Sequence, residues 1–292
     1  MTQNLARRDF LAATGAALVT LAASQPALAA PTPGKFKKAV KIYMVQPGKT
    51  ILEKMTLLKE LGYDGIELDF PGPYSVEDVK KAMDATGLIV PGVVDSVHWN
   101  DRLSDPKPET RKKGLDALLG ALQYSKDIGG TSVLLVPGKV TADAPFKECF
   151  DRSVAEIKKA IPTAEKLGID ILIENVWNDF LTDPKTMAEF IDACGSKIVG
   201  AHFDVGNTLR YSPSHEWVPI LGKRIKKLDI KDWSKDDRGF KAKLLEGDAD
   251  WTKVMAELKK IGYEGWGTAE IPGGDREWLT DVAARMDKIF AL

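Results

Sequence analysis

Short apolar runs rich in β-branched residues alternate along this chain with longer segments of helical periodicity. Several helical segments end in glycine, the residue best suited to the left-handed conformation after a helix. Eight such strand–helix units predict a single α/β domain, a closed parallel (β/α)8 TIM barrel. An open doubly wound sheet is the alternative, but the first run lacks the Gly-rich turn that binds nucleotides in such sheets. The strands are expected at 39–44, 65–70, 88–95, 131–136, 170–174, 198–204, 226–231 and 266–271.

The first residues have the pattern of an export signal. Arg7 and Arg8 precede Phe-Leu, a weakly apolar stretch follows, and Ala-Leu-Ala offers a small-x-small cleavage site. This pattern is typical of a twin-arginine signal, with an ordinary secretory signal or an amphipathic tail as alternatives. We therefore expect a periplasmic or otherwise exported protein with a signal peptide over 1–29, a linker over 30–37 and the barrel over 38–292.

Composition excludes several classes of protein. The 292 residues carry a formal net charge of −1 and form no basic stripe, so nucleic acid is not an expected partner. No segment of the mature chain reaches the roughly 20 apolar residues needed to span a membrane. Three histidines are too few for a His-rich metal cluster. The two cysteines, Cys149 and Cys194, are expected near opposite ends of successive helices, too far apart to bond, and therefore as free or buried thiols.

Four carboxylates close four predicted strands in the second half of the chain. They are Glu174, Asp204, Asp229 and Glu270. The carboxyl ends of barrel strands converge on one mouth, where active sites form. Four carboxylates there repel one another unless a cation neutralises them. Each alone could be a strand-end salt bridge, but together they predict a divalent metal site in an enzyme.

The second half of the chain resembles the xylose isomerase-like TIM barrels, the sugar phosphate isomerase/epimerase family. The matching pieces are IEN at 173–175, FDVGN at 203–207 and the segments 217–233 and 246–270. Members hold a divalent metal with a Glu, an Asp, a His and a second Glu on successive strands, and both Glu residues also move protons on the sugar. The resemblance implies a metal site at Glu174, Asp204, Asp229 and Glu270, with Glu174 and Glu270 catalytic.

Asp229 departs from the family pattern, which usually has His at this position. A carboxylate still ligates a cation, and it makes the site all-oxygen, which suits Mn²⁺ or Mg²⁺ better than Zn²⁺ or Co²⁺. The alternative is that Asp229 forms an ion pair with Lys231 or Lys227 and that this chain binds metal poorly or not at all.

Several residues near the predicted strand ends are candidates for binding a sugar. Tryptophans there offer flat surfaces for the apolar face of a sugar ring, although each could equally cap the core. The predicted substrate-binding residues are Lys231, Asn207, His98, Trp99, Trp177 and Trp233. Asp275 is expected as a helix N-cap, where a phosphate would otherwise bind, so a non-phosphorylated sugar or glycoside is the expected partner.

Three functions fit these observations. The first is a metal-dependent isomerase or epimerase that removes a proton next to a carbonyl through an enediolate stabilised by the metal. The second is a lyase that uses the same site to cleave 3-keto-glycosides. The third is a carbohydrate-binding barrel without catalysis, which stays an alternative because Asp229 departs from the family pattern.

Overall fold

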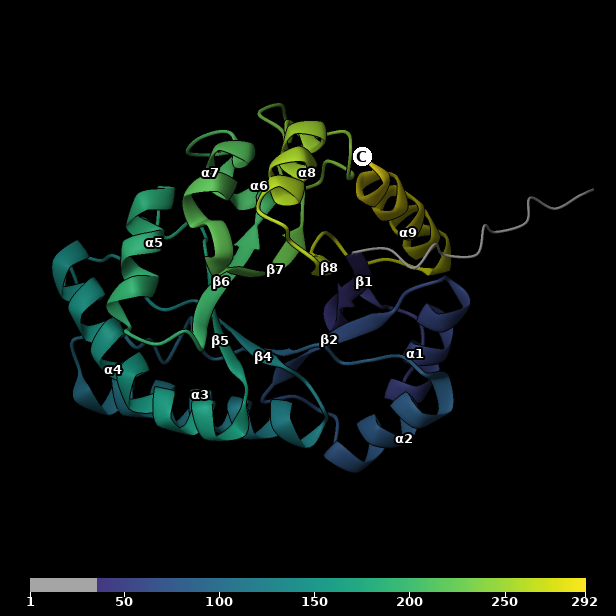
Figure 1. The fold of residues 1–292 in the computed structure, drawn as a ribbon. Helices are drawn as coiled ribbons and strands as arrows, with labels where there is room; N and C mark the ends of the chain where they lie inside the picture. Colours follow the sequence, from purple (N-terminus) through teal and green to yellow (C-terminus); the bar gives the residue numbers. More distant parts are fainter. Residues whose placement is uncertain (1–35) are drawn as a thin grey trace, which may run out of the picture. The chain divides into compact units, whose positions relative to one another are not determined.

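A computed structural model describes residues 36–292, which form a closed parallel barrel of eight strands in sequence order (Figure 1). The predicted signal peptide lies outside the described residues. The strands are β1 (Phe36–Lys41), β2 (Gly65–Phe70), β3 (Val93–Asp95), β4 (Ser132–Leu135), β5 (Asp170–Glu174), β6 (Val199–Asp204), β7 (Ile225–Ile230) and β8 (Gly265–Ala269). The predicted (β/α)8 barrel is therefore confirmed.

Helices surround the barrel and follow the strands in the expected alternation (Figure 1). They are α1 (Ile51–Glu60), α2 (Val76–Thr86), α3 (Pro108–Asp127), α4 (Phe146–Leu167), α5 (Pro184–Ala193), α6 (Val205–Thr208), α7 (Ser214–Leu221), α8 (Trp251–Lys260) and α9 (Arg276–Ala291), with short 3-10 turns η1 (Ile42–Met44) and η2 (Gly222–Arg224). None of the helices within residues 36–292 is long and apolar enough to cross a membrane. Cys149 and Cys194 are buried free thiols, as expected.

Strand β1 starts earlier than the apolar pattern predicts, inside the expected linker. Phe36 pairs with Gly265 of β8 and stacks on Phe290 at 5.1 Å between ring centroids. Lys38 is buried along its stem and reaches Asp287 at 2.6 Å. Three of the six residues of β1 are lysines, so hydropathy alone places the strand too late. The expected first run ends instead in the short turn η1.

Strand β3 is shorter than predicted because Pro91 and Gly92 interrupt the apolar run. Ile89 makes only an isolated bridge to Gly65, and regular pairing resumes at Val93. Proline lacks the N–H that a central strand needs for its ladder. Pro91 instead offers its carbonyl oxygen, which accepts hydrogen bonds from Thr131 and from the ammonium of Lys227.

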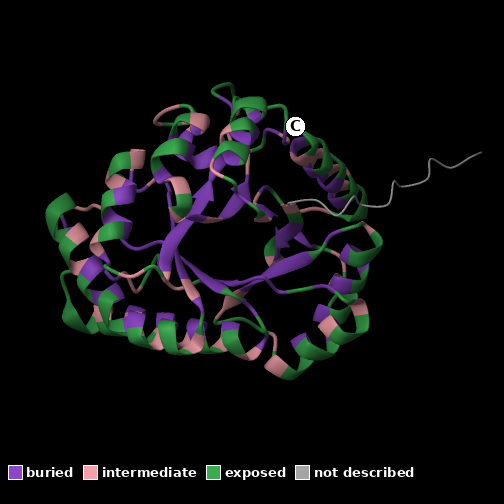
Figure 2. Ribbon diagram, in the orientation of Figure 1, coloured by how far each residue is buried: buried purple, intermediate pink, exposed green. Residues whose placement is uncertain are grey.

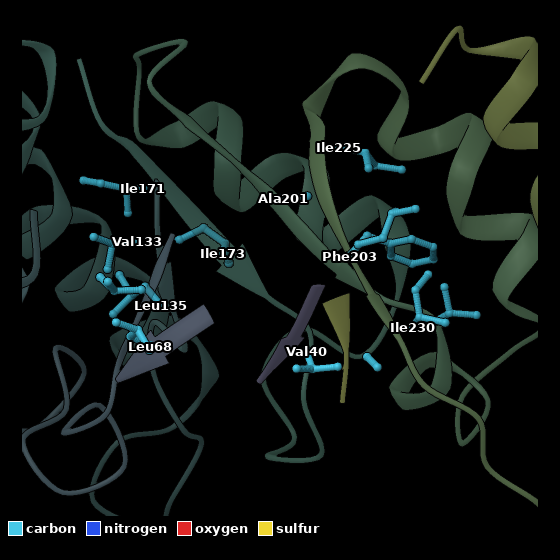
Figure 3. Packing of buried hydrophobic residues seen from close by; sticks show 14 of the residues in the cluster. Val40, Leu68, Val133, Leu135, Ile171, Ile173, Ala201, Phe203, Ile225 and Ile230 are labelled. Atoms are coloured by element: carbon cyan, nitrogen blue, oxygen red, sulfur yellow. The ribbon is translucent and has the colours of Figure 1, made fainter. Parts of the chain in front are cut away.

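Most strand residues are buried, whereas the helices present an exposed outer face (Figure 2). Apolar side chains such as Val40 and Ile230 belong to the hydrophobic core (Figure 3). Their immediate neighbours in sequence, Lys41 and Asp229, contact each other although β1 and β7 are not paired. Such a contact crosses the inside of the barrel. Alternate residues of these strands therefore differ: one set is apolar and packs in the hydrophobic core, and the other set lines a polar interior.

Candidate metal and substrate site

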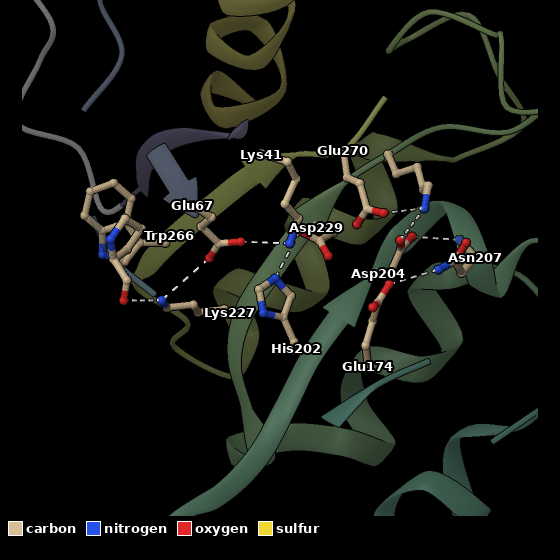
Figure 4. Close-up of polar contacts among 12 residues, drawn as sticks. Lys41, Glu67, Glu174, His202, Asp204, Asn207, Lys227, Asp229, Trp266 and Glu270 are labelled. Carbon is tan, nitrogen blue, oxygen red and sulfur yellow. Dashed lines mark hydrogen bonds and ion pairs between the residues drawn. The ribbon is translucent and has the colours of Figure 1, made fainter. Parts of the chain in front are cut away.

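The four predicted carboxylates meet at the mouth of the barrel (Figure 4). Glu174 and Asp204 are the last residues of β5 and β6, Asp229 lies one residue before the end of β7, and Glu270 follows β8. One oxygen from each carboxylate lies within 4.8 Å of the others. The barrel thus brings together residues that are spread over nearly a hundred positions, and their role as metal ligands stays a prediction.

Lys231 compensates part of this charge. Its Nζ lies 3.0 Å from Asp204 Oδ2 and 3.2 Å from Glu270 Oε1, and the side chain is largely buried. The sequence predicts Lys231 as a substrate-binding residue. The structure shows its ammonium held by two carboxylates, so any contact with substrate would be made by a group already engaged. We call Glu174, Asp204, Glu270 and Lys231 the mouth cluster.

The carboxyl groups of the mouth cluster hold protons more tightly than usual. Burial, followed by the charges of Glu270 and Asp229, raises the pKa of Glu174 well above its ordinary value. Burial likewise raises the pKa of Asp204, and burial together with the nearby Asp229 raises the pKa of Glu270 to about 8 against the opposing effect of Lys231. Each shift has the same cause, which is negative charge concentrated away from water.

Asp229 differs from these three carboxylates. Its Oδ1 lies 3.0 Å from Lys41 Nζ and 3.0 Å from His202 Nε2. Although burial opposes ionisation, His202 and Lys41 hold the pKa of Asp229 well below its usual range. Asp229 does form an ion pair, and its partner is Lys41. The prediction that its partner is Lys231 or Lys227 is wrong. Asp229 Oδ2 remains buried with no hydrogen-bond partner among the described residues.

Beneath the mouth lies a second group of charged residues, which we call the interior cluster: Lys41, Glu67, His202 and Lys227 (Figure 4). Lys41 Nζ contacts Glu67 Oε2 at 2.8 Å, and Lys227 Nζ lies 3.7 Å from Glu67 Oε1 and 2.5 Å from the carbonyl oxygen of Pro91. Burial lowers the pKa of Lys227 to about 8 despite Glu67. Glu67, His202 and Asp229 lie close enough to share a metal ion. However, the ammonium of Lys41 already contacts both Glu67 and Asp229 and supplies the positive charge there.

The mouth cluster fits a divalent cation on two observations. Glu270 Oε2 and Asp229 Oδ2 are both buried acceptors without a partner within the described chain. With these groups taken as ionised and His202 as neutral, the two clusters and Asp229 comprise five carboxylates and three lysines, which leaves two negative charges uncompensated. Buried carboxylates with unmet oxygens either coordinate a cation or bind protons, and the raised pKa values record the second outcome.

A cavity of about 410 Å³ opens above the mouth cluster. Five of the six predicted substrate-binding residues line it: His98, Trp99, Trp177, Asn207 and Lys231. Trp233 does not line it and instead packs edge-on against Trp177, with ring centroids 5.5 Å apart. Further lining residues include Lys41, Tyr43, Asp69 and Phe240.

Hydrogen bonds fix the orientation of several cavity side chains. His98 Nδ1 accepts from the amide of Val136 at 3.2 Å, so the neutral ring carries its hydrogen on Nε2. Burial, followed by the charge of Lys41, lowers the pKa of His98 to about 3, which keeps the ring neutral. Asn207 Nδ2 donates to Glu174 Oε1 at 3.3 Å, and Trp177 Nε1 donates to the carbonyl oxygen of Asn207 at 2.7 Å.

Comparison with known proteins places this fold and site in a class. Residues 55–289 match the xylose isomerase-like TIM barrel family, and the chain belongs to that family. The L-ribulose-5-phosphate 3-epimerase UlaE of Salmonella heidelberg is 23% identical over 262 residues, which cover 82% of this chain and 91% of that protein. The protein MJ1311 of Methanocaldococcus jannaschii is 22% identical over 228 residues, covering 74% and 78% of the two chains.

Three solved structures illustrate the similarity of the fold. The D-psicose 3-epimerase of Clostridium cellulolyticum H10 with D-tagatose has a TM-score of 0.74 at 16% identity, covering 87% of this chain and 98% of that one. The IOLI protein with a zinc atom has a TM-score of 0.74 at 16% identity, covering 87% and 98%. The 3-keto-D-glucoside 4-epimerase YcjR of E. coli has a TM-score of 0.72 at 16% identity, covering 89% and 100%.

Proposed function

We propose that this protein is a divalent-metal-dependent isomerase or epimerase that acts on a non-phosphorylated sugar. The observation that carries the proposal is the pair of glutamates at the cavity floor, Glu174 and Glu270, beside unmet carboxylate oxygens and an excess of two negative charges. Similar proteins include sugar epimerases, which supports the same class of reaction here.

The residues that would hold the cation are Glu174, Asp204, Asp229 and Glu270. Oδ2 of Asp229 is free for this role because Lys41 and His202 engage Oδ1. An all-oxygen set favours Mn²⁺ or Mg²⁺. When bound, the cation would stabilise negative charge that develops on the sugar's carbonyl oxygen.

Proton transfer falls to the two glutamates. They come from β5 and from the end of β8, so their carboxylates approach the cavity from different strands. In the metal-free protein the pKa of each glutamate is raised, that of Glu270 to about 8, and a raised pKa makes a carboxylate a stronger base. Removal by one glutamate and return by the other on the opposite face would give epimerisation. Asn207 fixes Glu174 by its hydrogen bond.

The cavity walls suit a neutral sugar. Trp99, Trp177 and Phe240 supply aromatic surface, and His98 presents an Nε2–H donor. The helix that follows β8, α9, has its N-terminus capped by Asp275, whose Oδ1 accepts from the Trp278 amide at 3.0 Å. A phosphate would bind at that position in many barrels, so the cap supports a non-phosphorylated substrate.

The proposal is tested by incubating metal-loaded protein with free and keto sugars in D₂O with Mn²⁺. Deuterium incorporation next to the carbonyl, detected by NMR, is the expected result even where no net turnover occurs. Absence of exchange with every sugar, in protein shown to contain Mn²⁺, would contradict the proposal and favour a carbohydrate-binding barrel.

A lyase acting on 3-keto-glycosides is the second candidate. Here the proton leaves the carbon next to the carbonyl, the bond to the glycosidic oxygen breaks, and that oxygen takes a proton. The exposed rim residues Tyr43 and Trp99, 54% and 46% accessible, leave room for a substituent on the sugar. Release of the aglycone from a 3-keto-glycoside identifies the lyase, whereas exchange without release identifies the epimerase.

We further propose that the protein is exported by the twin-arginine route. The proposal rests on the paired arginines Arg7 and Arg8 and the weakly apolar stretch after them. Replacing both with lysine is expected to leave the precursor in the cytoplasm, as fractionation and immunoblotting would show. Normal export of the double variant would overturn the proposal.

A further inference from the structure

A second cavity adjoins the first at the rim of the barrel. It also measures about 410 Å³ and lies against η1, the loop before α1 and the loop before α2. Tyr43 and Asp69 line both cavities. Residues that line only the second include Gln46, Lys54, Pro73 and Tyr74. Because the two cavities share Tyr43 and Asp69 as a wall, they are neighbours at the rim of the barrel.

Asp69 at this shared wall is a half-buried carboxylate that no described residue binds by a hydrogen bond or ion pair. Burial raises its pKa, against the effect of Lys41. The other charged group of the second cavity, Lys54, is already used, because its ammonium donates to the backbone carbonyl oxygens of Val45 and Pro47. Asp69 and Lys54 carry opposite charges, so the cavity has no excess of positive charge that would favour an anionic ligand such as a phosphate.

Aromatic rings complete the chemistry of this cavity. Tyr43 is 54% exposed and Tyr74 is partly exposed, and both rings line the space. Rigid amphipathic rings beside an unpaired carboxylate and the amide of Gln46 match a group with an apolar face and several hydroxyls. At about 410 Å³ the second cavity lies within the usual size range of small-molecule sites.

We propose that the second cavity binds a neutral, polyhydroxylated group attached to the reacting sugar, so that the substrate is a disaccharide or glycoside rather than a free monosaccharide. This inference rests on the proposed function for the position of the reacting ring. It assigns Tyr74 and Gln46 to substrate selection, since they line the second cavity alone. It adds no chemical step to the reaction.

The test compares a 3-keto-disaccharide with the corresponding 3-keto-monosaccharide. Calorimetry on Mn²⁺-loaded protein gives the two affinities, and deuterium exchange gives the two rates. The disaccharide is expected to bind at least about tenfold more tightly. Tyr74→Ala should reduce this ratio to near one, and Tyr74→Phe, which keeps the ring, should preserve most of it. Far-UV circular dichroism confirms that both variants fold.

The outcomes separate the inference from the proposed function. Equal affinities for the two sugars in the wild-type protein, or an unchanged ratio in Tyr74→Ala, would overturn the second cavity as a binding site. Preferential binding of the disaccharide without deuterium exchange in either sugar would keep the binding site and refute the proposed function. Binding of inorganic phosphate in the second cavity, lost in Tyr74→Ala, would refute the assignment to a neutral group.

Discussion

The mouth cluster and the interior cluster use the same kinds of residue within one barrel, yet they differ in how their charges are met. In the interior, Lys41 and Lys227 face Glu67 and Asp229 as contacting pairs of opposite charge. At the mouth, the single ammonium of Lys231 contacts Asp204 and Glu270 but not Glu174, and Glu270 Oε2 has no partner within the described residues. The pKa values follow this difference, since Lys41 lowers the pKa of Glu67 against burial whereas burial and repulsion raise the pKa of Glu174.

This contrast teaches how to distinguish a structural ionic network from a ligand site. A buried network whose charges are paired has no reason to bind a cation, although His202 Nδ1 in the interior cluster is also buried without a hydrogen-bond partner among the described residues. A cluster with unmet acceptors and surplus charge is costly until something binds there. Asp229 belongs to both, with Oδ1 in the interior network and Oδ2 facing the mouth.

The largest effect is expected in the interior cluster. Lys41→Met leaves Glu67 and Asp229 without their shared ammonium, and breaking a buried pair on one side costs about 3–5 kcal/mol of unfolding free energy. The matched control is Lys226→Met, which removes a partly exposed ion pair to Asp170 and should cost under about 1 kcal/mol. Urea denaturation measures both. Equal losses of unfolding free energy in the two variants would show that the buried ion pairs of Lys41 stabilise the fold no more than a partly exposed ion pair does.

The second effect concerns catalysis at the mouth. Glu174→Gln or Glu270→Gln should lower turnover by at least about 10²-fold, the usual scale for losing a general acid or base. Folding should survive, because each change removes one of several repelling carboxylates. Deuterium exchange on the best substrate measures the rate. Near-normal exchange in either variant would remove that glutamate from proton transfer.

A smaller effect is expected from pH in the metal-free protein. Glu270 has a pKa of about 8 when folded and 4.5 as its ordinary value, so between these values the folded state binds more protons than the unfolded state. Stability should therefore rise as pH falls from 8.5 to 5.5. Relative to Glu270→Gln, the wild-type protein should gain on the order of 2 kcal/mol between pH 8.5 and pH 6.5. Parallel pH profiles for the two proteins, measured by thermal unfolding, would contradict the raised pKa.

Most of the fold can be predicted from the sequence because strand and helix periodicities alternate cleanly. The convergence of the four strand-end carboxylates, Glu174, Asp204, Asp229 and Glu270, can be predicted too, since strand ends converge on one face of a barrel. The partners of Asp229 cannot, because Lys41 and His202 lie far from it in sequence and on strands whose register decides the contact. A lysine within a strand such as β1 reads as exposed, and only the closed barrel shows that it points inward.

Side chains on loops were the least predictable part of the site. Trp177 and Trp233 look alike in sequence, each just past a strand end, yet one lines the cavity and the other packs behind it. Tyr43 gave no signal of its own, and the position of Asp69 at the end of the second predicted strand left its role open. Their position depends on the early end of β1 and on how η1 turns across the rim.

The central claim is that the mouth cluster binds a divalent cation and the interior cluster does not. Titration of metal-free protein with Mn²⁺ by calorimetry tests it most directly, on the wild-type chain, Asp204→Asn and Glu67→Gln. We predict one site in the wild-type protein, a loss of at least about tenfold in affinity for Asp204→Asn, and affinity within about threefold of wild type for Glu67→Gln. Absence of binding in the wild-type protein, or equal losses in the two variants, would contradict the claim.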